Sequence, residues 1–299
     1  MILTGLASCA EDTSEQPSTE SPATEVPATE TIDTSDTTAD TAVVAEGISV
    51  PTGADDVVVK IERGLGGFRT FQSTFAGVPA LLITGDGRVF SEGPVPAIFP
   101  GPFLPNIQVA KIDPALLVEL MGDAAGAGLL DQIPDYTVGQ PGVTDVGSTA
   151  LTLVANGRTY VHDAYALGME QPEQGDAPAR KALNGFIESA TAKVATATST
   201  VNSERFIPTT YLLATQPSEI SPDTTTDPAS GEPQPRLQLW PGEIGVDLKD
   251  LKCAPVDAAK VQELFEKADQ LTFFFQDSGI YSLAVRPMLP GQPGCDSLK

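Results

Sequence analysis

The chain has 299 residues, a hydrophobic fraction of 41% and a formal net charge of −23. This length suffices for one large domain or two ordinary domains with an apolar core. The charge argues against nucleic acid as a partner, because an acidic surface repels phosphates. The same charge opposes binding to anionic lipid, so any membrane contact needs a covalent or an apolar device.

The first residues point to such a device. Leu6-Ala7-Ser8-Cys9 resembles the bacterial lipobox, in which a peptidase cleaves before a cysteine that receives diacylglycerol. Small residues before the cysteine suit the peptidase, so we expect Cys9 to be lipidated and interpret residues 1–9 as a truncated lipoprotein signal. No Lys or Arg precedes Cys9, which indicates either a start codon placed too late or a shortened signal.

Residues 10–46 have the composition of a spacer. They contain ten Asp or Glu and no Lys or Arg, and a Glu-x-Pro-x-Thr pattern recurs every five residues from Glu15. Such a segment has too few apolar groups to bury a core. We therefore predict a disordered acidic Thr/Ser/Pro/Glu linker over 10–46 and a globular α+β domain over 47–299. A second stretch of this composition, 215–236, predicts a mobile loop within that domain.

Alternating apolar residues and turn signals predict hairpins in the folded part. Asp113 followed by Pro114 predicts a helix start, because Asp caps the first turn and Pro fits the first helical position. The predicted elements are strands at 57–62, 72–84 and 107–111, a hairpin turn at Asp86-Gly87, a helix from 113 to Gly126, a second hairpin at 149–167 turning at Asn156-Gly157, and a helix at 177–196.

A similar unit occurs twice. Residues 256–275 match residues 112–131 at a constant offset, and Asp257 takes the place of Asp113. Each helix runs into a strand-rich segment, which is compatible with internal duplication of a strand-helix-strand unit or with two unrelated amphipathic helices. Hairpins without a βαβ rhythm favour an α+β fold with a mainly antiparallel sheet and a few packed amphipathic helices.

The chain has three cysteines, Cys9, Cys253 and Cys295. If Cys9 carries lipid, Cys253 and Cys295 are free to pair in an oxidising compartment. We expect this disulfide because the residues around Cys295 have the composition of an exposed tail that needs fixing. A reduced, buried pair is the alternative.

The residues that could carry chemistry do not form a recognisable site. His162 is the only histidine, and its neighbour Asp163 should point to the opposite face of a strand. A satisfied or exposed strand histidine is therefore favoured over a general base. The cysteines and His162 lack the spacing of a zinc site, and Gly64–Gly67 lacks the lysine of a phosphate loop. We assign no catalytic residue, no metal and no cofactor.

Residues 93–106, with the sequence GPVPAIFPGPFLPN, combine five prolines with large apolar side chains. The favoured interpretation is a stiff connection whose side chains close one end of the sheet. The alternative is an exposed rim that contacts a partner, since contiguous exposed apolar surface usually marks interaction. The candidate contact residues are Ile98, Phe99, Phe103 and Leu104.

The chain resembles a group of uncharacterised actinobacterial-type envelope lipoproteins and secreted proteins. The resemblance rests on ITGDGRV (83–89), FPGPFLPNIQVAKID (99–113), AYALG (164–168), ADQLTFFF (268–275) and YSLAVRPMLPGQPGC (281–295). These motifs consist of turns, caps and core positions, so they transfer no chemistry to this chain.

The sequence thus favours a non-catalytic extracytoplasmic lipoprotein, held on the cell membrane by a lipid on Cys9. We expect its domain to bind another envelope protein or an envelope component. Two alternatives stay open, a cell-envelope hydrolase and a carrier of an apolar small molecule. A cleft with converging carboxylates would favour the first, and a closed lipid-sized cavity the second.

Overall fold

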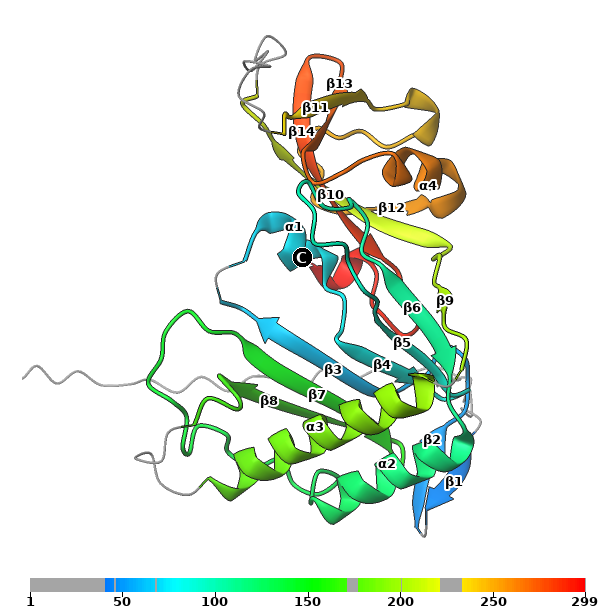
Figure 1. Ribbon diagram of the computed structural model, residues 1–299, viewed down its shortest axis with the longest axis vertical. Coiled ribbons are helices and arrows are strands. Elements are labelled where there is room, and N and C mark those ends of the chain that lie inside the picture. Colours follow the sequence, from blue (N-terminus) through cyan, green and yellow to red (C-terminus); the bar gives the residue numbers. More distant parts are fainter. Residues whose placement is uncertain are drawn as a thin grey trace, which may run out of the picture. The chain divides into compact units, whose positions relative to one another are not determined.

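The computed structural model describes residues 41–45, 47–67, 69–170, 177–199, 201–220 and 233–298, all within a single unit that spans 39–299 (Figure 1). In these residues the chain forms a seven-stranded sheet, a five-stranded sheet, a two-stranded hairpin and four α-helices. This is the α+β class predicted from the sequence. None of the described helices combines the length and the apolar character that crossing a bilayer requires.

The seven-stranded sheet is antiparallel throughout, with the order β8-β7-β3-β4-β5-β6-β9. The predicted turns at Asp86-Gly87 and Asn156-Gly157 join β4 to β5 and β7 to β8. Asn156 and Gly157 have φ values of 53° and 69°, which Asn and Gly adopt at low cost in a two-residue hairpin. The strands are β3 (Val57–Leu65), β4 (Leu81–Thr84), β5 (Arg88–Glu92), β6 (Ile107–Lys111), β7 (Ser148–Ala155), β8 (Arg158–Tyr165) and β9 (Glu204–Arg205).

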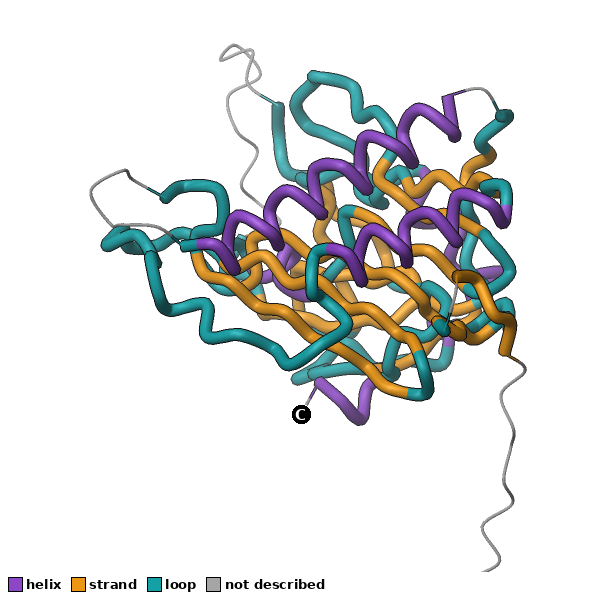
Figure 2. The backbone as a smooth tube through the Cα atoms, turned by 90° about the horizontal axis from the view of Figure 1, so that it is seen from below, coloured by secondary structure: helices purple, strands orange, loops and turns teal. Residues whose placement is uncertain are grey.

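Two helices, α2 (Pro114–Gly126) and α3 (Pro178–Ser199), lie side by side across one face of this sheet (Figure 2). Asp113 caps α2, accepting a hydrogen bond from the N–H of Ala115 at 2.8 Å, as the sequence predicted. Lys193 of α3 pairs with the carboxylates of Glu119 and Asp123 on α2. The apolar stripe of each helix meets the inward side chains of the strands, and the shared core includes Leu117, Leu120, Met121, Leu151, Leu153, Leu183, Ile187 and Val194.

The central strands of the sheet are buried on their other face as well. Leu82 and Phe90 point away from the helices and pack with Ile107 and Leu289. Leu289 comes from the C-terminal end of the chain, so residues distant in sequence close this face. Burial on both faces explains why all four residues of β4 are buried.

The five-stranded sheet has the order β11-β13-β14-β10-β12 and is antiparallel except for β11 and β13. The helix α4 (Ala258–Glu266) covers one face of it. The core between them is aromatic, because Trp240, Phe265, Phe274 and Tyr211 meet there. The strands are β10 (Thr210–Pro217), β11 (Arg236–Leu239), β12 (Ala254–Asp257), β13 (Thr272–Gln276) and β14 (Gly279–Pro287), and short 3₁₀ turns span η3 (Gly242–Ile244) and η4 (Cys295–Leu298).

The prediction of a continuous strand over 72–84 was wrong in its first half. Residues Phe71–Ala76 form a short helix, α1, and only Leu81–Thr84 form a strand. Thr70 accepts a hydrogen bond from the N–H of Ser73, and Gly77 ends the helix in the left-handed conformation. The helix packs on β14, so tertiary contact and two caps outweigh the strand-like composition.

Two boundaries also differ from the sequence prediction. The strand β1 (Thr41–Ala45), which pairs with β2 (Ile48–Pro51), lies inside the range assigned to the linker, so the folded part begins by Thr41. The loop predicted at 215–236 is shorter, because β10 extends to Pro217 and β11 begins at Arg236. The signal at 1–9 and the linker up to residue 40 fall outside the described residues, as do residues 221–232 of that loop.

The repeated unit predicted from the sequence is present as local structure. Asp257 caps α4 through the N–H of Ala259 at 2.9 Å, as Asp113 does for α2. In both places a strand, a capped helix and a hairpin follow one another. The two hairpins join their sheets differently. In the first hairpin the first strand, β7, pairs with β3, whereas in the second hairpin the second strand, β14, pairs with β10. The similarity is therefore confined to the local unit.

Cys253 and Cys295 form a disulfide with an S–S distance of 2.00 Å, as predicted. It ties the C-terminal segment beside the start of β12, in the five-stranded sheet. Gln292 in the same segment donates a hydrogen bond to the carbonyl of Gly77. A structural disulfide is consistent with a location outside the cytoplasm.

Replacing Cys253 and Cys295 by Ser should lower the free energy of unfolding by about 3–4 kcal/mol, because a 42-residue separation gives the reduced chain much more freedom when unfolded. Urea unfolding of the variant beside the wild type measures the loss. Two alkylatable thiols in native wild-type protein isolated without reductant would contradict the pairing.

Candidate functional site

The most unusual surface feature is a run of exposed apolar residues between β5 and β6. All six residues from Pro94 to Phe99 are exposed, and none has a polar side chain. Val95 is 57% exposed, and Ile98 and Phe99 are each 66% exposed. We call residues 94–99 the apolar arch. Large apolar side chains scattered singly on a surface are ordinary, whereas a contiguous exposed run indicates interaction.

The first end of the apolar arch is fixed by hydrogen bonds to the start of β6. The N–H of Gly93 donates to the carbonyl of Asn106 at 2.7 Å. The Asn106 side chain donates to the carbonyl of Pro94 at 2.8 Å and accepts from Gln108 at 2.7 Å. A Cβ at Gly93 would lie 2.6 Å from Cγ of Gln108 and 2.7 Å from Nδ2 of Asn106, so any other residue here would force these side chains to move.

The second end is fixed to the five-stranded sheet. The N–H of Gly101 donates to the side chain of Gln270, and the N–H of Gln270 donates to the carbonyl of Gly101. Pro102 forms an isolated antiparallel bridge with Asp269. The apolar arch therefore spans two anchored points, one at the start of β6 and one at the turn before β13, which hold both ends of its backbone in place.

The structure separates the four residues that the sequence grouped as a partner-contact rim. Ile98 and Phe99 are exposed, as a contact surface requires. Leu104 is buried in the core beneath α4, and Phe103 is partly buried, with ring centroids 5.3 Å from Phe265 and 5.7 Å from Phe274. The favoured interpretation placed these side chains in the core. It holds for Phe103 and Leu104, which pack in the aromatic core of the second sheet, and it is wrong for Ile98 and Phe99. The alternative of a contact rim is wrong for Phe103 and Leu104.

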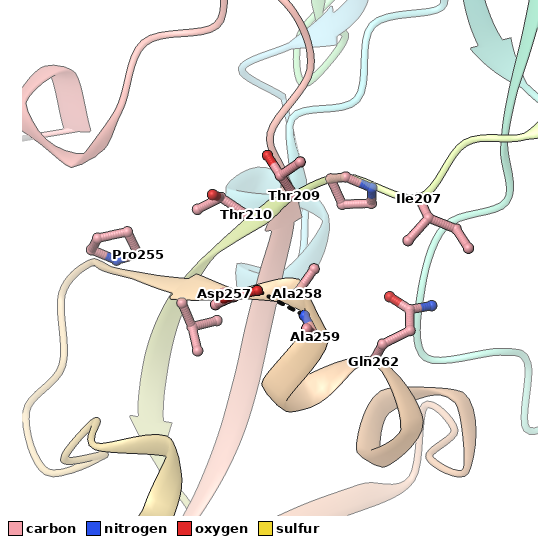
Figure 3. A pocket seen from close by; sticks show the side chains of 10 residues that line it. Ile207, Thr209, Thr210, Pro255, Asp257, Ala258, Ala259 and Gln262 are labelled. Carbon is pink, nitrogen blue, oxygen red and sulfur yellow. Dashed lines mark hydrogen bonds between the residues drawn. The ribbon is translucent and has the colours of Figure 1, made fainter.

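A pocket of about 760 Å³ lies at the start of α4, where β10 and β12 meet it (Figure 3). Two of its polar side chains are bonded within the protein: Asp257 caps α4, and Gln262 accepts a hydrogen bond from the hydroxyl of Tyr211 at 2.7 Å. The surroundings offer mainly apolar contact. The lining residues are Ile207, Pro208, Thr209, Thr210, Pro255, Val256, Asp257, Ala258, Ala259 and Gln262.

His162 is fully buried within a hydrogen-bonded network. Its Nε2 donates to the carbonyl of Leu129 at 2.8 Å, which leaves Nδ1 to accept from the hydroxyl of Tyr136 at 2.7 Å. Burial lowers the pKa of His162 and raises the pKa of Tyr136 to about 12. Asp163 points to the other, exposed face, so the interpretation of His162 as a satisfied strand histidine is confirmed.

Arg180, which no sequence motif singled out, is fully buried and extends this network. Its guanidinium pairs with Glu170 at 2.6 Å and donates to the carbonyls of Tyr136 and Tyr165 at 2.9 Å and 2.8 Å. Partial burial raises the pKa of Glu170, but hydrogen bonds from the backbone and Arg180 outweigh it and hold the pKa low. Helical spacing could have revealed the burial of Arg180, because this residue precedes the core residue Leu183 by three positions.

A second pocket, of about 380 Å³, lies on the exposed face of β8. Its carboxylates are Asp135 and Asp163, and Asp135 is engaged by the backbone and hydroxyl of Thr137 at 2.9 Å and 2.7 Å. In the part of the chain that the structure describes, no three His, Cys, Asp or Glu side chains gather as a metal site would need.

Comparisons with protein-family models, with curated proteins and with solved structures found no match for this chain.

The two phenylalanines should respond differently to truncation. Phe103→Ala should cost about 2–4 kcal/mol of unfolding free energy, because it opens a gap against Phe265 and Phe274. Phe99→Ala should change stability by no more than about 0.5 kcal/mol, since the ring is exposed. Thermal unfolding of both variants beside the wild type tests this. Equal losses would show that the apolar arch is part of the core.

The single histidine should make stability depend on pH. The folded pKa of His162 is lowered from 6.5, so the unfolded chain binds the proton first and stability falls as pH drops below about 6.5. Denaturant unfolding from about pH 7.5 to about pH 5 measures the slope. His162→Gln should remove the part of the pH dependence of stability that arises from His162, while the acidic residues contribute equally to the pH dependence of both proteins. Identical slopes in both proteins would contradict the assignment.

Proposed function

We propose that this chain is a non-catalytic extracytoplasmic lipoprotein that binds an envelope partner through the apolar arch. A lipid on Cys9 anchors it to the cell membrane, and residues 10–40 act as the spacer. The domain presents its contact surface to a protein or another component of the envelope.

The observation that carries the proposal is the apolar arch itself. Exposed Val95, Ile98 and Phe99 cost free energy in water, and such a surface is retained where a partner covers it. Hydrogen bonds at Gly93 and Gly101 fix both ends of the loop. A surface held in its binding conformation loses less entropy on association than a flexible one.

Other features support the placement and the non-catalytic role. The disulfide fits an oxidising compartment, and the lipobox supplies the attachment that an acidic surface cannot provide. His162 is committed to two hydrogen bonds inside the core, where it supports the loop that includes Tyr136. It has a structural role there that needs no substrate.

The anchor is tested in cells with a complete export signal placed before Leu6. The protein should partition into detergent, and Cys9→Ala should release it, because the acidic surface provides no electrostatic substitute. Ser8→Ala is the matched control and should stay in the detergent phase, since alanine also fits the peptidase. Detergent partitioning of Cys9→Ala equal to the wild type would refute the anchor.

A further inference from the structure

We infer that the partner of the apolar arch is the lipid–water interface of the membrane on which the chain is anchored. This inference rests on the proposed function and names the component that the contact surface meets. Ile98 and Phe99 enter the boundary between headgroups and acyl chains, and the acidic remainder of the domain stays in water.

The side chains of the apolar arch fit lipid better than a protein pocket. Residues 93–106 contain no charged residue, in a chain with 40 acidic and 17 basic residues. The exposed run offers no polar side chain that could fix its orientation in a partner. Protein interfaces combine apolar anchors with about one hydrogen bond per 100–200 Å², whereas a lipid surface makes no directional demand.

The backbone is also suited to an environment poor in water. Unsatisfied N–H groups are costly near hydrocarbon, and Pro94, Pro96 and Pro100 have none. The carbonyl of Pro94 accepts a hydrogen bond from Asn106 within the protein. The other residues of the apolar arch keep their N–H groups, for which the phosphate and ester oxygens of the headgroups are available acceptors.

The length of chain before the fold lets this surface reach the bilayer. Thirty-two residues lead from Cys9 to Thr41, where β1 begins (41 − 9 = 32). Fully extended they span about 110 Å, against a radius of gyration of about 18 Å for a domain of this length. The tether raises the effective concentration of the bilayer at the domain, so a few inserted side chains suffice.

Charge decides which lipid is preferred. The net charge of −23 is repelled by anionic headgroups. Insertion is therefore stronger into phosphatidylcholine vesicles than into vesicles rich in phosphatidylglycerol, and salt reduces the difference because it screens the repulsion.

The experiment places a fluorophore in the apolar arch of the full chain. Phe99→Trp is made together with Trp240→Phe, which removes the only other tryptophan, and Cys9→Ser with an N-terminal hexahistidine tag replaces the lipid. The probe is a phosphatidylcholine vesicle with a small fraction of nickel-chelating lipid. We expect a blue-shifted emission and quenching by brominated acyl chains. The matched control is Leu239→Trp, since Leu239 of β11 is 59% exposed; it should show neither effect.

Loss of the apolar contact is measured without the tether, at lipid concentrations raised until the wild-type protein sediments; a wild type that never sediments overturns the inference. Ile98→Asp with Phe99→Asp should lower the fraction that sediments with phosphatidylcholine vesicles at least about tenfold. The fold is monitored by circular dichroism, and both sites are exposed, so it should be unchanged. Equal sedimentation of the variant, or tighter binding to anionic vesicles, would overturn the inference.

A photo-crosslinker at position 98 in cells separates this inference from the proposed function. Crosslinks to lipid support both. Crosslinks confined to one protein, with no emission shift on vesicles, overturn the lipid inference and leave the proposed function standing. If no crosslink forms, and the apolar arch is as accessible to solvent in cells as in the purified protein, both the lipid inference and the proposed function are overturned.

Discussion

The two sheets of this fold each complete the core of the other. The loop after β5 carries Leu104 from the seven-stranded sheet into the aromatic core under α4, and the segment after β14 carries Leu289 back against Leu82 and Phe90. Each sheet thus has one apolar cluster that a segment leaving the other sheet completes, while α2 and α3 cover the remaining face of the seven-stranded sheet. The disulfide at Cys295 holds the segment after β14 in place. The same segment is therefore fixed both by a covalent bond and by the packing of Leu289.

This exchange also explains why exposed apolar residues occur where they do. A loop that leaves one sheet and enters the core of the other is exposed to solvent between its two anchored points. The apolar arch is this exposed part of the loop. Polar residues would suit this part of the loop equally well as far as the fold is concerned. The exposed side chains of residues 94–99 lie outside the apolar clusters that this loop connects. The pocket at α4 is next to the same aromatic core, and the side chains of Asp257 and Gln262 in its lining are bonded within the protein.

Local signals were sufficient for most elements but not for contacts between distant ones. Asp113 and Asp257 could be recognised as caps, and Asn156-Gly157 as a turn, because each depends on neighbouring residues alone. The helix α1 was missed, since its packing on β14 joins residues about 200 positions apart. The division between Phe99 and Phe103 was equally hidden: the two rings are four residues apart in one proline-rich loop, and only the position of Phe265 and Phe274 distinguishes them. Arg180 was missed because an arginine on a helix is ordinarily taken to face solvent.

The buried imidazole of His162 has a practical consequence. Because the chain has one histidine, its ring gives a single set of side-chain resonances in a nuclear magnetic resonance spectrum, free of overlap from other imidazoles. The proton on Nε2 is held by the carbonyl of Leu129 and exchanges with solvent only when that contact opens. Its exchange rate therefore reports the local opening of the segment around Tyr136, separately from unfolding of the five-stranded sheet.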